Sequence, residues 1–253
     1  MAATVFYLDP LPDVGQVAVL DGKEGRHAAT VRRTRVGEQL VLADGRGGIA
    51  RAEVVAVGKD RLDLTITARD DLPAATPAVT LVQALPKAER SELAVELATE
   101  AGIDEIVPWQ SARCVAKWEG PKAVKGVARW QAVAVAAAKQ SRRAHIPEVV
   151  ELHRTARVLD RVQTAVGCGG VVLVLHESAT AELASLDLRA APEIVLVVGP
   201  EGGLADDEVA ALTGAGATAV RLGPTVLRTS TAAAVALGAL GVLTDRWAAA
   251  PLQ

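Results

Sequence analysis

Hydrophobic and polar positions follow two different rhythms along this chain, and the change comes near residue 75. In the first part, short runs of β-forming residues are separated by Asp-Gly, Gly-Arg-Gly and Gly-Lys-Asp turn signals. These runs predict strands at residues 16–20, 39–42, 48–57 and 61–67, and a short helix at residues 27–33. Short strands at such close spacing favour a small β-barrel.

From residue 79 onwards, apolar runs alternate with stretches of helical periodicity. The apolar runs predict strands at residues 79–84, 103–108, 171–175, 194–198 and 219–222. The helical stretches cover residues 88–101, 127–142, 206–213 and 231–245. This alternation predicts a mostly parallel sheet covered by helices. The polar, proline-containing segment 70–77 is the expected linker, so we place one domain at residues 1–72 and a second at 73–253.

Two of the predicted strands run directly into a Gly-Pro loop that is followed by a helix. The first loop is Gly199-Pro200-Glu201-Gly202-Gly203, and the second is the LGPTVLRTST segment at residues 222–231. Because ligands collect where parallel strands end, the two loops predict one shared pocket. Tight turns and helix caps explain either loop equally well when it is taken alone. Neither loop matches the P-loop or the GxGxxG fingerprint, so spacing does not identify the ligand.

The acidic residues after the first loop are explained by helix capping. Asp206 is the expected N-cap, and Asp207 and Glu208 then lie in the first turn, where the helix dipole favours negative charge. We therefore assign no chemistry to these three side chains.

The charge distribution is uneven, although the formal net charge of −3 counts mildly against a nucleic-acid binder. Four arginines fall within ten residues: Arg26, Arg32, Arg33 and Arg35. Eight further cations, opposed only by Glu119, stand between residues 112 and 147: Arg113, Lys117, Lys122, Lys125, Arg129, Lys139, Arg142 and Arg143. They are either an RNA-binding surface or a solvated helix face whose acidic partners lie elsewhere in the fold.

Several protein classes are not expected from the composition. No apolar run reaches the roughly 18 residues of a transmembrane helix, and no basic region followed by an apolar block marks a signal peptide. Cys114 and Cys168 fit no metal or disulfide spacing. We expect both to be buried free thiols in a reducing cytoplasm, and we expect no metal.

The combination of GPEGG with LGPTVLRTSTA resembles the SPOUT class of methyltransferases, in particular the bacterial 16S rRNA uridine N3-methyltransferase family of the RsmE type. Further segments recur in that family's order: HAATVRR at 27–33, ADGRG at 43–47, QALPK at 83–87, EAGI at 100–103, SARC at 111–114, QSRR at 140–143 and HE at 176–177. The resemblance implies an α/β fold, in which a SPOUT domain with a deep trefoil knot follows a small PUA-like or OB-like β-barrel. It also implies RNA binding by the first domain and a homodimer whose cofactor pocket lies near the interface.

The same resemblance implies S-adenosylmethionine as the cofactor and places it in the knot loops. The matching cofactor-binding positions are Leu175, His176, Glu177, Gly199, Glu201, Gly203, Leu222, Gly223, Leu227, Thr229, Ser230, Thr231 and Ala232. The implied RNA-binding positions are Arg26, Arg32, Arg33, Arg35, Arg113, Lys117, Arg142 and Arg143.

Uridine N3 becomes a good nucleophile only when its proton leaves, so the reaction needs a base or a cation that stabilises the imide anion. Arg228 is the catalytic candidate, and because arginine stays protonated we expect it to act as that cation. The alternative is that Arg228 only organises its own loop through hydrogen bonds to carbonyl groups.

Three positions depart from the family's frequent residues. Ser230 stands where a Glu is common, Leu97 where a Lys is common, and Lys139 where a Glu is common. If that Glu takes part in catalysis, its role here must pass to another residue or to water. Lys139 is expected to make the cationic surface more basic.

The function that the resemblance implies is methylation of N3 of uridine 1498 in 16S rRNA of the small ribosomal subunit. One alternative is a SPOUT methyltransferase acting on another RNA base or on a ribose 2′-hydroxyl. Another is a non-catalytic RNA-binding factor in ribosome assembly that retains the fold.

Overall fold

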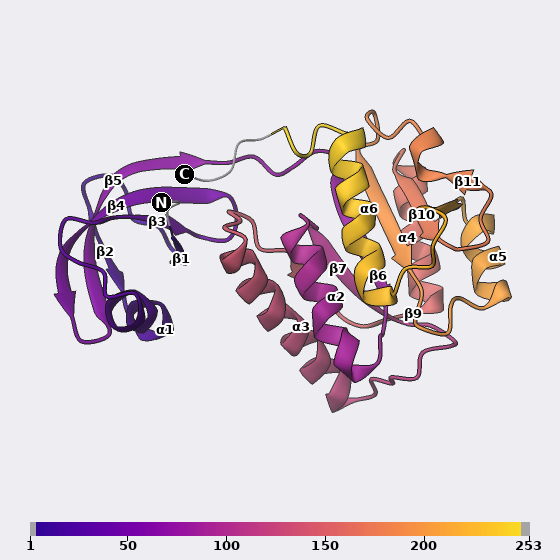
Figure 1. Ribbon diagram of the computed structural model, residues 1–253, viewed down its shortest axis with the longest axis horizontal. Coiled ribbons are helices and arrows are strands. Elements are labelled where there is room, and N and C mark those ends of the chain that lie inside the picture. Colours follow the sequence, from indigo (N-terminus) through magenta and orange to yellow (C-terminus); the bar gives the residue numbers. More distant parts are fainter. Residues whose placement is uncertain (1–3, 249–253) are drawn as a thin grey trace. The chain divides into compact units, whose positions relative to one another are not determined.

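The computed structural model describes residues 4–248, apart from the side chain of Glu89, and divides them into two compact units. The N-terminal unit contains residues up to 74 together with the distant segment 138–146 (Figure 1). The C-terminal unit contains residues 75–137 and the described residues from 147 onwards. A chain cut near residue 78 would therefore separate segment 138–146 from the unit in which it packs.

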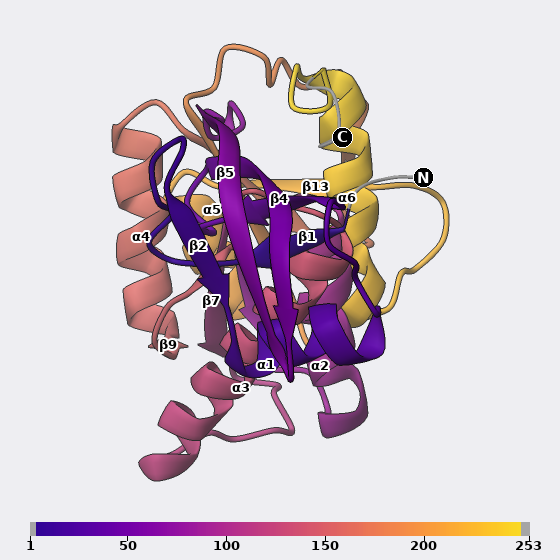
Figure 2. The same ribbon diagram turned by 90° about the vertical axis from the view of Figure 1, so that its left-hand side faces the viewer.

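A five-stranded sheet forms the N-terminal unit, in the order β1-β3-β4-β5-β2. The strands are β1 (Val5–Tyr7), β2 (Val17–Leu20), β3 (Gln39–Ala43), β4 (Gly48–Gly58) and β5 (Arg61–Asp71). Figure 2 shows β4 and β5 running side by side as the long antiparallel pair of this sheet. The four predicted strands are confirmed, whereas the three-residue β1 is too short to have left a pattern.

The predicted short helix is present, but it begins earlier and has two parts. Helix α1 (Gly22–Arg26) continues into a π-helical turn, η1 (His27–Val31). Arg33 follows with a positive φ of 56°, which ends the turn.

The sheet of the C-terminal unit has eight strands in the order β11-β13-β10-β12-β6-β7-β8, with β9 also paired to β7. Its strands are β6 (Ala78–Ala84), β7 (Glu105–Gln110), β8 (Glu148–Val149), β9 (His153–Arg154), β10 (Val171–Leu175), β11 (Ala181–Glu182), β12 (Glu193–Val198) and β13 (Thr218–Arg221). The strand pairs are all parallel, which confirms the predicted sheet type. Apolar runs such as Ile194–Val198 are buried throughout because helices cover both faces.

The helices of this unit are α2 (Ala88–Glu100), α3 (Pro121–Gln140, whose last residues belong to the N-terminal unit), α4 (Thr155–Gly167), α5 (Asp206–Gly214), α6 (Thr229–Leu243) and a 3-10 turn, η2 (Leu183–Ser185). Figure 1 shows α2 and α6 side by side on one face of the sheet, with α4 on the other. Helix α4 is absent from the sequence prediction, although Val158, Val162 and Ala165 form its buried stripe at helical spacing.

Two arginines connect the ends of strands in the C-terminal unit. Arg161 of α4 contacts Glu193 and Glu105, and the hydrogen bond to Glu193 raises the pKa of its guanidinium. Arg246, with only 5% of its side chain exposed, pairs with Asp104 at 2.8 Å and donates to two backbone carbonyls. These ion pairs fix the edge of the sheet opposite the glycine loops.

One expectation about the cysteines is wrong. Cys114 is buried, and burial raises the pKa of its thiol, whereas Cys168 is exposed just beyond the end of α4. Over residues 4–248, no helix is long and apolar enough to cross a membrane, and no group of three or more potential ligand side chains could hold a metal ion.

Segment 138–146 packs into the N-terminal unit through specific polar contacts. Lys139 Nζ lies 2.6 and 2.7 Å from the two carboxylate oxygens of Glu24. The Tyr7 hydroxyl donates to the Arg143 carbonyl at 2.8 Å, and burial raises the pKa of Tyr7 to about 12. Lys139 is thus charge-balanced, which corrects the expectation that it makes the cationic surface more basic.

Replacing Lys139 with Glu, the residue common in similar sequences, should destabilise this chain. The substitution places two carboxylates together in a half-buried site, so the free energy of unfolding should fall by about 2 kcal/mol. The double exchange Glu24→Lys with Lys139→Glu should recover most of that loss. Urea denaturation of the parent and the two variants measures both effects, and a Lys139→Glu variant as stable as the parent would show that the pair contributes nothing.

Candidate functional site

Three loops meet at one edge of the parallel sheet. Strand β10 lies between β12 and β13, and each of the three ends at that edge. His176 follows β10, Gly199 follows β12, and Leu222 follows β13. The two loops predicted to share a pocket do so, and the loop after β10 joins them.

The loops enclose a cavity of about 380 Å³. It is lined by Arg90, Leu175, His176, Glu177, Val198, Gly199, Pro200, Glu201, Gly203, Leu204, Val226, Leu227, Arg228, Thr229 and Ala232. A smaller adjoining space of about 80 Å³ adds Leu222, Gly223 and Thr225. Of the predicted cofactor-binding residues, only Ser230 and Thr231 line neither space, and the binding role of the set stays a prediction.

Glycine suits two points of the GPEGG loop. A Cβ atom on Gly199 would lie 3.0 Å from Leu204 Cγ, so the Leu204 side chain would have to shift by a few tenths of an ångström to admit it. Gly203 has φ +69°, a conformation that other residues adopt only with strain. The bare backbone at these positions leaves the cavity wall open to close approach by a ligand.

A buried hydroxyl joins the first loop to the start of α6. Thr229 Oγ1 donates to the Gly199 carbonyl at 2.7 Å and accepts from Gln83 Nε2 at 2.9 Å. Gln83 lies on β6 and is fully buried, and its side-chain oxygen has no hydrogen-bond partner among the described residues. The side-chain amide of Gln83 therefore holds the hydroxyl that positions the GPEGG loop, a role that sequence reasoning did not assign to it.

Arg228 stands at the N-cap of α6 with its side chain exposed at the cavity. Its backbone carbonyl accepts from the backbone N–H groups of Thr231 and Ala232 at 2.9 and 3.0 Å. Its guanidinium makes no hydrogen bond or ion pair within residues 4–248. The carbonyl, rather than the guanidinium, organises this loop, which leaves the cation available to a ligand.

Neighbouring segments hold the GPEGG loop. Glu201 Oε1 accepts from the backbone N–H of Lys87 at 3.0 Å, so its carboxylate joins the loop to the start of α2. Arg113 Nη1 donates to the Leu204 carbonyl at 2.8 Å and to the Gly202 carbonyl at 3.4 Å. Arg113 thus supports this loop, and its contact with RNA stays a prediction.

The helix after this loop is capped differently from the expectation. Ala205, not Asp206, is the N-cap of α5. Glu208 is 4% exposed and accepts from the backbone N–H groups of Ala112 and Ala205 and from the Thr155 hydroxyl. This carboxylate therefore joins three segments, a structural role beyond the helix dipole that the sequence pattern did not indicate.

His176 has a defined orientation at the cavity. Its Nδ1 accepts from the backbone N–H of Ser178 at 3.2 Å. In the neutral ring this contact leaves the proton on Nε2, which can then donate to a ligand.

The predicted RNA-binding arginines at the start of the chain are exposed. Arg26 ends α1, and Arg32, Arg33 and Arg35 follow η1; none of the four side chains forms a hydrogen bond or ion pair within the described part of the chain. Arg142 is exposed in the same unit, and Arg143 is half-buried there. Segments more than a hundred residues apart in the sequence thus supply cations to one unit.

The remaining cations divide between paired and unpaired side chains. Lys117 is exposed in the C-terminal unit, whereas Arg129 pairs with Glu92. Arg129 and Lys139 therefore have acidic partners within the fold, as the alternative expects, whereas the RNA contacts of Arg113 and Lys117 stay predictions.

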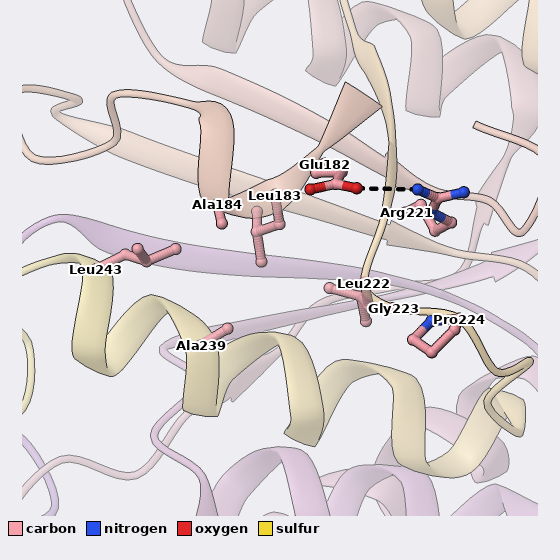
Figure 3. A pocket seen from close by; sticks show the side chains of 9 residues that line it. All are labelled: Glu182, Leu183, Ala184, Arg221, Leu222, Gly223, Pro224, Ala239 and Leu243. Carbon is pink, nitrogen blue, oxygen red and sulfur yellow. Dashed lines mark hydrogen bonds and ion pairs between the residues drawn. The ribbon is translucent and has the colours of Figure 1, made fainter. Parts of the chain in front are cut away.

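A second cavity of about 460 Å³ lies on the other side of the loop after β13 (Figure 3). Leu222 and Gly223 line both this cavity and the small space next to the first. Arg221 donates to Glu182 at 3.0 Å at its wall, and Ala239 and Leu243 of α6 contribute apolar side chains. The cation at this wall therefore already has an acidic partner.

Comparison with known proteins gives consistent results over nearly the whole chain. Residues 74–241 match the RNA methyltransferase domain family, and residues 20–67 match the RNA methyltransferase PUA domain family. Proteins named ribosomal RNA small subunit methyltransferase E are 60% identical in Mycobacterium bovis, over 98% of this chain and 94% of theirs, and 32% identical in Bacillus subtilis, over 89% and 90%.

Solved structures agree with these matches. The ribosomal RNA small subunit methyltransferase E of Neisseria gonorrhoeae, bound to S-adenosylmethionine, superimposes with a TM-score of 0.85 at 30% identity, covering 96% of this chain and 98% of that one. A methyltransferase from Legionella pneumophila, also with bound S-adenosylmethionine, gives a TM-score of 0.84 at 28% identity, covering 96% and 99%.

Thr229→Val should destabilise the loop junction. It removes the donor to the Gly199 carbonyl and the acceptor of Gln83, both buried, so the free energy of unfolding should fall by about 2 kcal/mol. Thr229→Ser keeps the hydroxyl and should lose less. Thr231→Val is the matched control, since that hydroxyl bonds only within its own helix turn. Equal losses for the variants at residues 229 and 231 in urea denaturation would contradict this role.

Proposed function

The chain belongs to the ribosomal RNA small subunit methyltransferase E family, and we propose that it transfers the methyl group of S-adenosylmethionine to N3 of uridine 1498 in 16S rRNA. The observation that supports this most directly is the meeting of the three loops around one cavity beside the Arg228 guanidinium, which has no partner among the described residues.

The cavity fits the proposed cofactor in size and in character. Its volume of about 380 Å³ lies within the range of roughly 300–1,000 Å³ that is usual for small-molecule sites. Gly199 and Gly203 expose backbone, Leu175 and Leu227 supply apolar walls, and the Nε2 atom of His176 can donate a hydrogen bond. S-adenosylmethionine supplies an electrophilic methyl group when bound.

Arg228 is the residue to which we assign charge stabilisation. Loss of the N3 proton spreads negative charge over the uracil imide, and a fixed guanidinium beside it lowers the energy of that anion. Because Arg228 stays protonated, it does not accept the proton.

Ser230 does not replace the Glu that is frequent at its position. Ser230 is 1% exposed, its hydroxyl has no hydrogen-bond partner among the described residues, and it does not line the cavity. We therefore propose that water or another cavity group accepts the N3 proton.

In this proposal, cationic side chains of both units bind the RNA. Arg26, Arg32, Arg33 and Arg35 are exposed and unpaired among the described residues, and a unit that matches an RNA methyltransferase PUA domain contains them. Phosphate contacts of this kind position the substrate, and groups at the cavity select the base. Arg142, Arg143, Arg113 and Lys117 complete the proposed set.

The remaining features that we propose follow from the family. They are a deep trefoil knot in the C-terminal unit, a closed barrel in the N-terminal unit, a cytoplasmic location and a homodimer. Exposed Val235 and Val242 on α6 and Trp247 beyond it offer an apolar surface for the dimer contact. Light scattering of the purified protein measures the oligomeric state.

The reaction itself is tested with labelled S-adenosylmethionine and small ribosomal subunits from a strain that lacks the family enzyme. Mass spectrometry of the 16S rRNA should show 3-methyluridine at position 1498. Transfer to a ribose oxygen or only to tRNA would contradict the N3 assignment, and absence of cofactor binding would favour an assembly factor.

Arg228→Ala should lower the rate of methyl transfer by about a hundredfold, the size of effect found when one donor to a developing anion is removed. Cofactor affinity should change much less, because most of the proposed cofactor contacts come from the three loops rather than from this side chain. Arg228→Lys, which keeps the charge, should recover part of the rate. Single-turnover kinetics and calorimetric titration separate the two quantities; equal losses in both would assign Arg228 to cofactor binding instead.

Replacing Arg32 and Arg33 together with Ala should weaken binding to the small subunit and flatten its dependence on salt. The log–log slope should become shallower by roughly 0.7 for each phosphate that the protein no longer binds. Melting temperature and cofactor affinity should stay unchanged, since neither guanidinium has a partner in the described part of the fold.

The matched control replaces Arg46 and Arg61 with Ala. It removes the same charge from the same unit, but these two arginines already pair with Asp9 and Asp63. A salt slope that changes equally in both double variants would show that net charge, rather than this surface, binds the RNA.

A further inference from the structure

A second guanidinium lines the cavity, and the sequence did not single it out. Arg90 lies in the first turn of α2 and reaches the same space as Arg228 and the GPEGG loop. Lys87, the residue just before α2, donates its backbone N–H to the Glu201 carboxylate at 3.0 Å. The loop and the helix that bears Arg90 are therefore fixed relative to each other.

Arg90 differs from the other arginines of the C-terminal unit that are partly or largely buried. Arg161 contacts Glu193 and Glu105, Arg221 contacts Glu182, and Arg246 contacts Asp104. The Arg90 side chain makes no hydrogen bond or ion pair with any described residue.

Withdrawing a cation partly from water without a counter-charge is unfavourable. A site of this kind becomes favourable when an anionic ligand brings the missing charge. Glu177 and Glu201 also line the cavity, but neither carboxylate forms an ion pair with Arg90, so its guanidinium remains available to an anionic ligand beside α2.

The proposed reactants offer two such anions, the carboxylate of the cofactor and the phosphates of the RNA. The cofactor carboxylate lies next to the cofactor's own ammonium group, which cancels much of its field. A phosphodiester has no internal counter-charge and presents two oxygens in the geometry that a guanidinium fork matches.

We propose that Arg90 binds a backbone phosphate next to the target nucleotide and so holds the base against Arg228. This inference rests on the proposed function, because it takes the cavity to be the place where an RNA base meets the cofactor. Arg90 is then a substrate-binding residue, and Arg228 acts on the base itself.

The test compares Arg90→Ala, Arg90→Lys and the control Arg189→Ala, which removes an exposed cation of the same unit that does not line the cavity. Binding of unmethylated small ribosomal subunits is measured at several potassium chloride concentrations and constant magnesium, with S-adenosylhomocysteine present. Binding of S-adenosylmethionine is measured separately by calorimetry.

For Arg90→Ala, we expect about a tenfold loss of affinity for the subunit, the size expected for one charge-assisted contact. The log–log salt slope should become shallower by roughly 0.7, the value for one phosphate contact to a single strand. Affinity for S-adenosylmethionine should stay within about twofold of the parent. Loss of a charge-assisted contact to the cofactor would lower that affinity by more than about twofold. Arg90→Lys should keep the salt slope while recovering only part of the affinity, and Arg189→Ala should match the parent.

Two results would overturn the proposal. A loss of S-adenosylmethionine affinity with unchanged subunit binding would assign Arg90 to the cofactor carboxylate. A lower melting temperature with both affinities unchanged would make it a packing residue. Because the binding measurements need no methyl transfer, they remain readable even if the protein methylates a different atom.

Discussion

The parallel pairing of β12 between β10 and β6 is the constraint on which the site depends. Parallel strands direct their carboxyl ends to the same edge, so the loops that leave β10, β12 and β13 must converge there. The same pairing places Gln83 of β6 under the start of α6, where its amide reaches Thr229. The order of the strands thus determines both the cavity and the polar contact at its base.

The convergence of the strand ends would not by itself fix the conformation of the glycine-rich GPEGG loop, because glycine gives the backbone more freedom than any other residue. The GPEGG loop is held from three directions: by Thr229 at the Gly199 carbonyl, by Lys87 at the Glu201 carboxylate, and by Arg113 at the Gly202 carbonyl and the Leu204 carbonyl just beyond it. Each contact comes from a different segment. The loop therefore presents bare backbone to a ligand while its conformation is set by its neighbours.

The cationic side chains form two groups, one that maintains the fold and one that remains available to a ligand. Cations that maintain the fold have acidic partners, as Arg161, Arg246 and Lys139 do. Arg228 and Arg90 at the cavity have none among the described residues. The net charge of −3 conceals this difference, because folding neutralises one group of cations and leaves the other available for an anionic ligand.

The sequence by itself determined the elements with strong periodicity, the parallel sheet, the two Gly-Pro loops and the family that their residues indicate. These features are local, since each depends on residues close together in the chain. The buried stripe of helix α4 is also readable in the sequence, whereas α5 has Ala205 as its N-cap rather than the expected Asp206. Only the tertiary structure decided which side chains meet: Lys139 with Glu24, Glu208 with Ala112, and Arg90 with the cavity. Those contacts join residues far apart in sequence, and no local pattern encodes the distance between them.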